Sequence, residues 1–339
     1  MELNILITSV GRRSYIVNYF KQALKGLGEV HACNSIYTIG MQAADDFFIA
    51  PAIYSDSYID EIIAYSKKHS ISAVLSLFDI DLLVLAKHAS RFEQEGIELI
   101  LAPEKFIAIC NDKLQTAHFA QRLGIRTPLT FSSINEVLTA LSKEELHYPI
   151  IMKPRWGMAS MSIFRAYNET ELLAFTDAAK REIENSYLKY ETAFTPKEPL
   201  IYQELLSGKE FGIDIIHDLK GQYQAAYVKQ KVSMRSGETD VGLTVNNAPF
   251  LDTIHTISSH SGHRGILSVD VFLVDGNVYL LEMNCRISGH YPISHLAGVN
   301  YPQMLVSWLQ GKEAPAKCFS YQEGLYATKD LMPTLLACH

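Results

Sequence analysis

Three oxygen-bearing side chains near the end of the sequence have the spacing of a metal site on a β-hairpin. Asp270 and Glu282 each lie six residues from Gly276, and Asn284 follows two residues later. If residues 275–277 form a three-residue loop, Asp270 lies directly opposite Glu282, and Asn284 shares their face because strand side chains alternate with period two. Opposed carboxylates repel one another, so this arrangement favours a bound cation, for which Mg²⁺ is the natural candidate.

Two alternatives remain open for this hairpin. Both acids could simply face solvent, as charged side chains mostly do. A two-residue turn would shift the register by one residue and place the two carboxylates on opposite faces. The flanking apolar residues favour the metal site, because they alternate with the acids and would bury the opposite face in a core. These residues are Val269, Val271, Leu273, Leu281 and Met283.

The composition limits the class of protein. The 339 residues allow two or three domains, and contents of 48% apolar and 20% charged residues are ordinary for a soluble globular protein. The net charge of −7 argues against nucleic acid as the main partner. Five cysteines without paired spacing suit a reducing compartment and no zinc site. We expect a cytoplasmic protein without a secretory signal or membrane partner, because no apolar run reaches the roughly 18 residues of a membrane span.

The first part of the chain is predicted to form a parallel α/β sheet, because short apolar runs alternate with helix-length segments. The expected strands are residues 3–10, 30–34, 73–78 and 98–101. Parallel sheets bind ligands at the carboxyl ends of their strands, which here lead into polar loops. A dinucleotide site would need three spaced glycines after the first strand, and only Gly11 is present, which argues against a Rossmann cofactor.

Charged residues in these loops are candidate substrate contacts. Arg12 and its neighbour Arg13 could grip a carboxylate or a phosphate, although an arginine pair on a surface loop is often without function. We select Arg12 for this contact. Asp79 and Asp81 could contact the same substrate, or they could be a helix cap and its neighbour.

The second part of the chain has a different pattern. A helix predicted for residues 104–123 ends at Gly124, and Pro128 marks a boundary. A short strand is expected at 150–153 and a helix at 169–184. Antiparallel strands are expected at 200–205, 211–219 and 223–232, with the hairpin as the C-terminal sheet. This part is therefore predicted to be α+β.

A lysine and the loop that follows it could bind phosphate. Lys153 ends an apolar strand, where a half-buried ammonium needs an anionic partner. Small residues in the next loop could fold over phosphates with their backbone N–H groups, and a plain connection is the alternative. These residues are Gly157, Ser160 and Ser162.

The segment between two expected strands could bind a nucleoside. The backbone at Glu204, Leu205 and Leu206 could hydrogen-bond an adenine, and Glu210 could accept from ribose hydroxyls; a charged turn is the alternative. Three cations on or after the next strand could offset charge on a transferring phosphoryl group, and alternation places the first two on one face. They are Lys229, Lys231 and Arg235.

The order of these motifs resembles the ATP-grasp superfamily over roughly residues 105–310. The residues that carry the resemblance are Lys113 near a helix start, Lys153-Pro154 with its loop, Gln203-Glu204 to Glu210, Asp270, and the run Glu282-Met283-Asn284-Cys285-Arg286. The chain is most similar to a single synthetase unit of the carbamoyl phosphate synthase large subunit. Residues 288–292 and 297–300 resemble the segment that follows the metal ligands in that family.

The resemblance implies a domain organisation. Residues 1–104 would form a pre-ATP-grasp α/β domain. Residues 105–311 would form the ATP-grasp domain, whose two subdomains clasp ATP, with a small lid subdomain at about 125–202. Residues 312–339 would form a C-terminal tail packed on this domain.

The resemblance also implies roles for the nucleotide-binding positions. Lys113 and Lys153 would contact the phosphates of ATP. Glu204 and the backbone after it would bind the adenine, and Glu210 would bind the ribose. The phosphate loop departs from the family, which usually has more glycine there. Met158, Ala159 and Met161 stand in these positions.

The resemblance implies a reaction as well. Asp270, Glu282 and Asn284 would hold Mg²⁺, with Mn²⁺ as a possible substitute, and Arg286 would stabilise an acyl phosphate or bind the acceptor. His290 is a candidate base, with a packed surface histidine as the alternative.

The expected activity is that of an ATP-dependent carboxylate–amine ligase that acts on a small acid and a small amine. The chain could form a homodimer. The full carbamoyl phosphate synthase subunit has two tandem units, and this chain has one. The alternatives are a nucleotide-binding regulatory protein without turnover and a phosphotransferase that releases its acyl phosphate.

Overall fold

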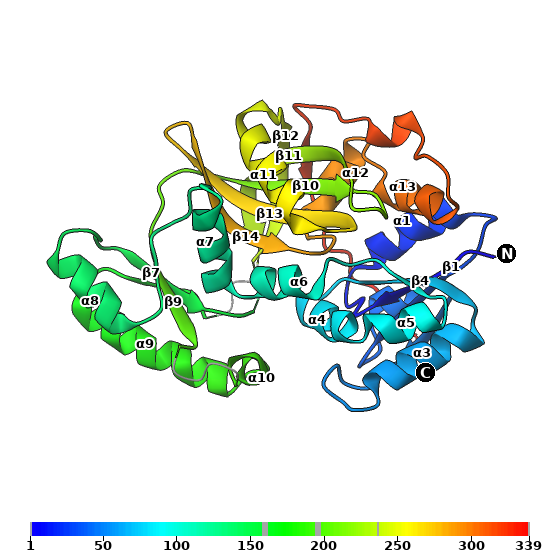
Figure 1. Cartoon of the computed structure of the whole chain (residues 1–339), viewed down its shortest axis with the longest axis horizontal. Coiled ribbons are helices and arrows are strands. Elements are labelled where there is room, and N and C mark those ends of the chain that lie inside the picture. Colours follow the sequence, from blue (N-terminus) through cyan, green and yellow to red (C-terminus); the bar gives the residue numbers. More distant parts are fainter. Residues whose placement is uncertain (1, 158–161, 194–197, 236, 338–339) are drawn as a thin grey trace.

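Three β-sheets organise the chain (Figure 1). The computed structural model describes residues 2–157, 162–193, 198–235 and 237–337. Within these residues, no helix is both long enough and apolar enough to cross a membrane. The predicted mixed architecture, a parallel sheet followed by antiparallel sheets, is confirmed.

The first sheet is parallel and has the order β3-β2-β1-β4-β5. Its strands are β1 (Asn4–Thr8), β2 (Val30–Asn34), β3 (Asp46–Ile49), β4 (Ile71–Ser76) and β5 (Glu98–Leu99). The sequence analysis missed β3, which is four residues long and only partly buried. The order reverses between β1 and β4, so the loops after these two strands meet at the switch point where such sheets bind ligands.

Helices cover both faces of this sheet, because alternate residues of each strand are apolar on both sides. Ile5 and Ile7 of β1 share a core with α1 (Ser14–Leu24) and with α13 (Tyr301–Leu309) from the far end of the chain. Leu6 faces the opposite core, which is formed with α3 (Tyr58–Lys68), α4 (Asp79–Lys87), α5 (Ala89–Gln94) and α6 (Glu104–Asn111). The short helix α2 (Ile39–Gln42) precedes β3.

A buried carboxylate joins the two strands at the switch point. Asp81, in the first turn of α4, accepts hydrogen bonds from the hydroxyls of Thr8, Ser9, Ser76 and Tyr58, and its side chain is fully buried. Because these donors come from three different segments, Asp81 fixes the loop ends relative to one another.

The helix predicted for residues 104–123 is broken, so that prediction is wrong. Asp112 ends α6 and is the N-cap of α7 (Lys113–Arg122), accepting from the backbone N–H groups of Leu114 and Gln115. The same carboxylate forms a bidentate ion pair with Arg155, with both N–O distances at 2.8 Å. The break therefore places Lys113 at a helix start beside the end of a strand.

A four-stranded antiparallel sheet with its own apolar core forms the region on the left of Figure 1. Its order is β6-β9-β7-β8, with β6 (Thr130–Phe131), β7 (Ile150–Pro154), β8 (Phe164–Ala166) and β9 (Leu200–Glu204). The helices of this region are α8 (Ile134–Ser142), α9 (Glu169–Glu184) and α10 (Leu188–Thr192).

The third sheet is antiparallel, with the order β14-β13-β10-β11-β12-β15. Its strands are β10 (Lys209–His217), β11 (Tyr223–Arg235), β12 (Glu238–Val245), β13 (Gly265–Val274), β14 (Asn277–Asn284) and β15 (Tyr326–Thr328). The predicted hairpin thus extends a sheet that β10 and β11 begin. The remaining elements are η1 (Ala248–Phe250), α11 (Leu251–Ser261), α12 (Tyr291–Leu296) and η2 (Ala316–Phe319).

The hairpin of β13 and β14 has the predicted pairing but not the predicted turn. Val274 pairs with Asn277, so Asp275 and Gly276, both with positive φ, form a two-residue turn instead of a three-residue loop. A β-bulge then shifts the register by one residue, so that Asp270 lies opposite Glu282 as predicted. The bulge corrects the register slip that the short turn would otherwise cause.

We predict that Asp81 stabilises the fold and does not contact a ligand. Asp81→Ala leaves four hydroxyl donors without their acceptor, and an unsatisfied buried polar group costs about 1–3 kcal/mol. We expect a loss of at least about 3 kcal/mol in the free energy of unfolding in urea. The exposed Asp56→Ala is the control and should change stability by less than about 0.5 kcal/mol. A stable Asp81→Ala protein with lost ATP affinity would contradict this role.

Candidate active site

A cavity of about 670 Å³ lies where the four-stranded and six-stranded sheets approach each other. Most of the residues predicted for phosphate, nucleoside and metal binding line it together. They are Lys113, Lys153, Gly157, Glu204, Leu205, Leu206, Glu210, Lys231, Asp270, Glu282, Asn284, Arg286 and His290.

The predicted metal ligands share one face of the hairpin. Asp270 pairs with Glu282, and Asn284 follows two residues later on the same side. Because of the bulge, Leu281 and Glu282 both line the cavity, while Leu280 and Met283 point into the core. The register alone therefore brings the two carboxylates together.

One oxygen of Asp270 is without a hydrogen-bond partner in the described part of the chain. Its Oδ2 atom lies 2.8 Å from Nζ of Lys231, whereas its buried Oδ1 atom lacks a hydrogen-bond partner among the described residues. Burial alone would raise the pKa of this carboxyl, but Lys231 and His290 hold the pKa well below its usual range. Asp270 is therefore ionised and offers an oxygen to a cation.

Lys231 bridges two acids. Its ammonium lies 2.7 Å from Oε1 of Glu210 and 2.8 Å from Oδ2 of Asp270, and only 4% of its side chain is exposed. Burial disfavours the charged form, but the two carboxylates raise the pKa of Lys231 above its usual range. Lys231 was predicted to contact the phosphoryl group. It thus forms ion pairs with Glu210, predicted to bind the ribose, and with Asp270, predicted to bind the metal.

Two further lysines lie at the other side of the cavity. Lys153 is buried at the end of β7, and the Lys113 ammonium donates to the carbonyl of Gly157. Burial and repulsion from Lys113 lower the pKa of Lys153 to about 8. Because Lys153 forms no close ion pair with the described residues, this buried cation suits an anionic ligand.

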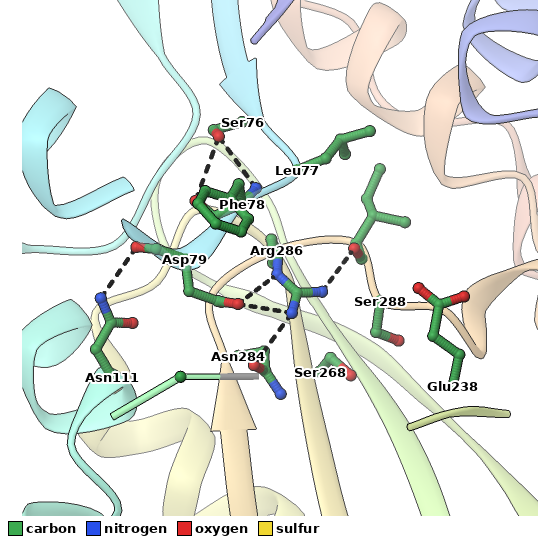
Figure 2. A network of polar contacts seen from close by, with 12 residues as sticks. Ser76, Leu77, Phe78, Asp79, Asn111, Glu238, Ser268, Asn284, Arg286 and Ser288 are labelled. Atoms are coloured by element: carbon green, nitrogen blue, oxygen red, sulfur yellow. Dashed lines mark hydrogen bonds and ion pairs between the residues drawn. The ribbon is translucent and has the colours of Figure 1, made fainter. Parts of the chain in front are cut away.

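Arg286 is held by a carboxylate from the first sheet. Its Nε and Nη2 atoms donate to Oδ2 of Asp79 at 2.8 and 2.6 Å, and Nη2 also lies 3.3 Å from Oδ1 of Asn284 (Figure 2). Burial opposes the charge, yet Asp79 raises the pKa of Arg286. Asp79, predicted as a substrate contact, therefore positions the arginine, and it lines a smaller pocket together with Glu282 and Asn284 of the main cavity.

His290 connects the cavity to a buried polar cluster. Its Nε2 atom lies 2.7 Å from Oγ of Ser268 and 3.5 Å from Oδ1 of Asp270. On the other side of the ring, Nδ1 lies 3.3 Å from Oδ1 of Asp214, which also pairs with the fully buried Lys229. Only 3% of the His290 side chain is exposed, so it is not the surface histidine of the alternative prediction.

The structure does not bring all predicted residues to the cavity. Asp81 is buried beneath the loops, and Arg12 is exposed on its loop. Arg235 is exposed and pairs with Asp240, and Ser162 donates to Glu182. Ser160 lies outside the described residues, as do the three neighbours that depart from the family pattern.

The sequence analysis weighed Arg13 but selected Arg12, and it missed Arg165 and Glu238, which also line the cavity. Arg13 lines the cavity in place of Arg12, and its Nη1 atom donates to the carbonyls of Leu77 and Ile287. The Nη2 atom of Arg13 lies 3.5 Å from Oε1 of Glu238, a residue of β12. Figure 2 shows the Glu238 side chain near Ser288. The adjacent arginines signalled a cationic loop, but only the backbone geometry decides which one points inward.

Comparisons with known proteins agree with this geometry. Residues 5–100 match the family described as PylC-like, N-terminal domain, and residues 196–328 match the family described as ATP-grasp in the biosynthetic pathway with Ter operon. The chain is 25% identical over 281 residues to the arginine-specific large chain of carbamoyl phosphate synthase from Geobacillus stearothermophilus. It is 23% identical over 216 residues to the large chain from Sulfolobus acidocaldarius. These alignments cover 79% and 61% of this chain, but only 25% and 19% of the relatives.

Solved structures extend the likeness to nearly the whole chain. An L-amino acid ligase from Bacillus licheniformis superposes with a TM-score of 0.70 at 18% identity, covering 91% of this chain and 75% of the ligase. The biotin carboxylase domain of 2-oxoglutarate carboxylase from Hydrogenobacter thermophilus, solved with MgADP and bicarbonate, superposes with a TM-score of 0.75 at 17% identity. That likeness covers 96% of this chain and 73% of the domain. The chain has the ATP-grasp fold. The resemblance inferred from the order of motifs is therefore confirmed at the level of the fold, while the roles of single residues stay predictions.

We predict that the affinity for MgATP falls as the pH rises through about 8. Lys153 attracts phosphate only in its protonated form, and its pKa is about 8. The affinity should therefore be constant below this pH and fall by up to about tenfold per pH unit above it. Titration calorimetry between about pH 7 and 9.5 measures this effect. Lys153→Arg stays charged throughout and should flatten the curve. Equal slopes for the two proteins would exclude Lys153 as the titrating group.

Proposed function

We propose that this protein is an ATP-dependent carboxylate–amine ligase, which forms an amide through an acyl phosphate and releases ADP and phosphate. One observation carries the proposal: Lys113 and Lys153 line the same cavity as the opposed carboxylates of Asp270 and Glu282. Cations that bind a polyphosphate, beside acids that hold a divalent metal, are the groups that phosphoryl transfer from ATP requires.

The nucleoside would bind between the two antiparallel sheets. The backbone at Glu204–Leu206 would hydrogen-bond the adenine, and Glu210 would accept from the ribose. Apolar side chains of the cavity would enclose the base from both sheets. They include Ile151, Phe272 and Leu281. Apolar walls with a few polar groups at the edge are typical of ligand sites, which supports this placement.

Asp270, Glu282 and Asn284 would hold Mg²⁺. The unpartnered Oδ1 atom of Asp270 and the acid opposite it fit a hard cation with oxygen ligands. When bound, the ion supplies positive charge to the phosphoryl oxygens. Lys231 keeps the other oxygen of Asp270 in place, so that the carboxylate is oriented before any ligand binds.

Arg286 and Arg13 would hold the acid substrate, with Asp79 as the positioning residue. A carboxylate oxygen of the acid would attack the γ-phosphorus of ATP, the bond to the β–γ bridging oxygen would break, and ADP would leave. The amine nitrogen would then attack the carbonyl carbon of the acyl phosphate, and phosphate would leave. The proton lost by the amine would pass to a base, for which His290 is the candidate in the cavity. The walls of the cavity would limit the access of water to the acyl phosphate.

The proposal extends to the size of the substrates, to the metal ion and to the assembly of the protein. The acid and the amine would be small molecules, because they share one cavity with ATP. Mn²⁺ would also support the reaction in place of Mg²⁺, since the same oxygen ligands suit both ions. A homodimer and a cytoplasmic location stay predictions.

We predict that Glu282→Gln abolishes ADP formation and leaves the fold intact. The amide keeps the shape of the side chain but removes the charge that holds the metal, so we expect the rate of ADP formation to fall at least about 100-fold. A coupled ADP assay and circular dichroism measure the two properties. Glu313→Gln, at an exposed position, is the matched control and should keep full activity. Near-normal turnover by Glu282→Gln would remove the metal assignment.

The ligase reaction predicts that ADP release requires an acid and an amine together. Acid and amine libraries are screened for ADP, for phosphate, and for the amide by mass spectrometry. ADP formed with an acid alone, without any amide, would instead identify a phosphotransferase. Tight ATP binding without hydrolysis for every pair would identify a regulatory nucleotide-binding protein.

A further inference from the structure

A second group of metal-ligating side chains lies far from the ATP cavity, at the amino ends of the strands of the first sheet. One ligand atom from each of His31, Asp46 and His69 lies within 4.8 Å of the other two. His31 is the second residue of β2, Asp46 begins β3, and His69 directly follows α3. The loops that reach the cavity leave the opposite, carboxyl ends of this parallel sheet.

The fold brings these residues together from three elements. His31 and Asp46 are register partners on neighbouring parallel strands, so their side chains share one face of the sheet. On that face the Tyr65 ring of α3 stacks on Phe48 and on His69, with centroid distances of 4.1 Å for both pairs. The stacked rings hold the end of α3 against the strands.

The distances suit ligands of one small ion. Nδ1 of His69 lies 3.4 Å from Oδ2 of Asp46, and Nε2 of His31 lies 3.5 Å from Oε2 of Glu29. Two ligand atoms bound to a tetrahedral zinc ion at 2.0–2.1 Å are about 3.3 Å apart. Small side-chain rotations therefore suffice to close the atoms of His31, Asp46 and His69 around one ion, and Glu29, which is outside this group, would turn toward it from beside His31.

His31 provides an independent indication of a ligand. Only 2% of the residue is exposed, and its Nε2 atom is buried without a hydrogen-bond partner among the described residues. Its Nδ1 atom lies 2.9 Å from the Tyr65 hydroxyl. An imidazole that donates one N–H to a neighbouring oxygen offers a lone pair on the other nitrogen, which is the arrangement of metal-bound histidines. An unpartnered buried nitrogen is otherwise unfavourable.

We propose that His31, Asp46 and His69, with Glu29 as the fourth ligand, bind a first-row divalent cation such as Zn²⁺. Imidazole and carboxylate ligands select zinc-like ions, whereas Mg²⁺ prefers oxygen ligands alone. The ion ties the end of α3 to the edge strands of the first sheet. It is structural and takes no part in the chemistry, because it lies at the end of the sheet away from the ATP cavity.

The test is zinc binding by the full chain. After treatment with EDTA and dialysis, Zn²⁺ is titrated by calorimetry in excess Mg²⁺, which occupies the cavity acids, and bound zinc is counted by mass spectrometry. We expect one zinc ion per chain. The variants His69→Ala and Asp46→Asn change partly exposed side chains, which limits their effect on folding, and each should weaken binding at least about tenfold. His147→Ala, an exposed histidine outside the cluster, is the control and should bind zinc normally.

Two further measurements complete the test. Zinc should raise the melting temperature of the wild-type protein but not that of the two variants, because the ion binds the folded state. Co²⁺ should give the visible absorption of a tetrahedral site in the wild-type protein and in the His147→Ala control, but not in His69→Ala or Asp46→Asn. Failure of the wild-type chain to bind zinc, or equal binding by all four proteins as an adventitious ion only, would overturn the proposal. Neither result depends on ATP turnover, so the zinc proposal and the proposed ligase function are tested independently of each other.

Discussion

The balance of charge inside the cavity is the constraint on which the rest of the site depends. Each buried cation and acid would be unfavourable alone, and the fold keeps them charged by setting opposite charges beside one another. Lys231 lies between Glu210 and Asp270, and Arg286 lies against Asp79. Lys153 has no such close partner among the described residues, and burial together with repulsion from Lys113 lowers its pKa. The uncompensated charges therefore indicate where a phosphate and a metal ion would complete the balance.

The positions of these charges come from all three sheets. The six-stranded sheet supplies the acids, the four-stranded sheet supplies Lys153, and the first sheet supplies Asp79 and Arg13 at its switch point. Asp112 has a similar linking role, because it caps α7 and binds Arg155 at the end of β7. The cavity thus depends on ion pairs that cross between sheets, and not on any one of the sheets alone.

The sequence predicted the parts of the site that follow from local periodicity and from the order of motifs. Asp270, Glu282 and Asn284 share a face as expected, although the Asp-Gly pair forms a two-residue turn and a bulge at Leu281 restores the register. Nothing in the local pattern reveals that bulge, because it depends on how β14 packs against β13. Which of two adjacent arginines points inward, and whether Asp81 is buried or reaches a ligand, likewise depend on distant segments. Cysteine spacing could not reveal the proposed zinc site, because its ligands are not cysteines. They come together only through the pairing of β2 with β3 and the packing of α3.

The contact between α1 and α13 has a consequence for how this protein can be divided. Tyr301, Met304 and Leu305, from the end of the chain, belong to the same apolar core as the strands and helix formed by its first residues. Cutting the chain after the first sheet would leave this helix without the surface it covers. The first sheet and the part of the chain that carries α13 therefore share one apolar core, so neither would keep its packing if the two were separated.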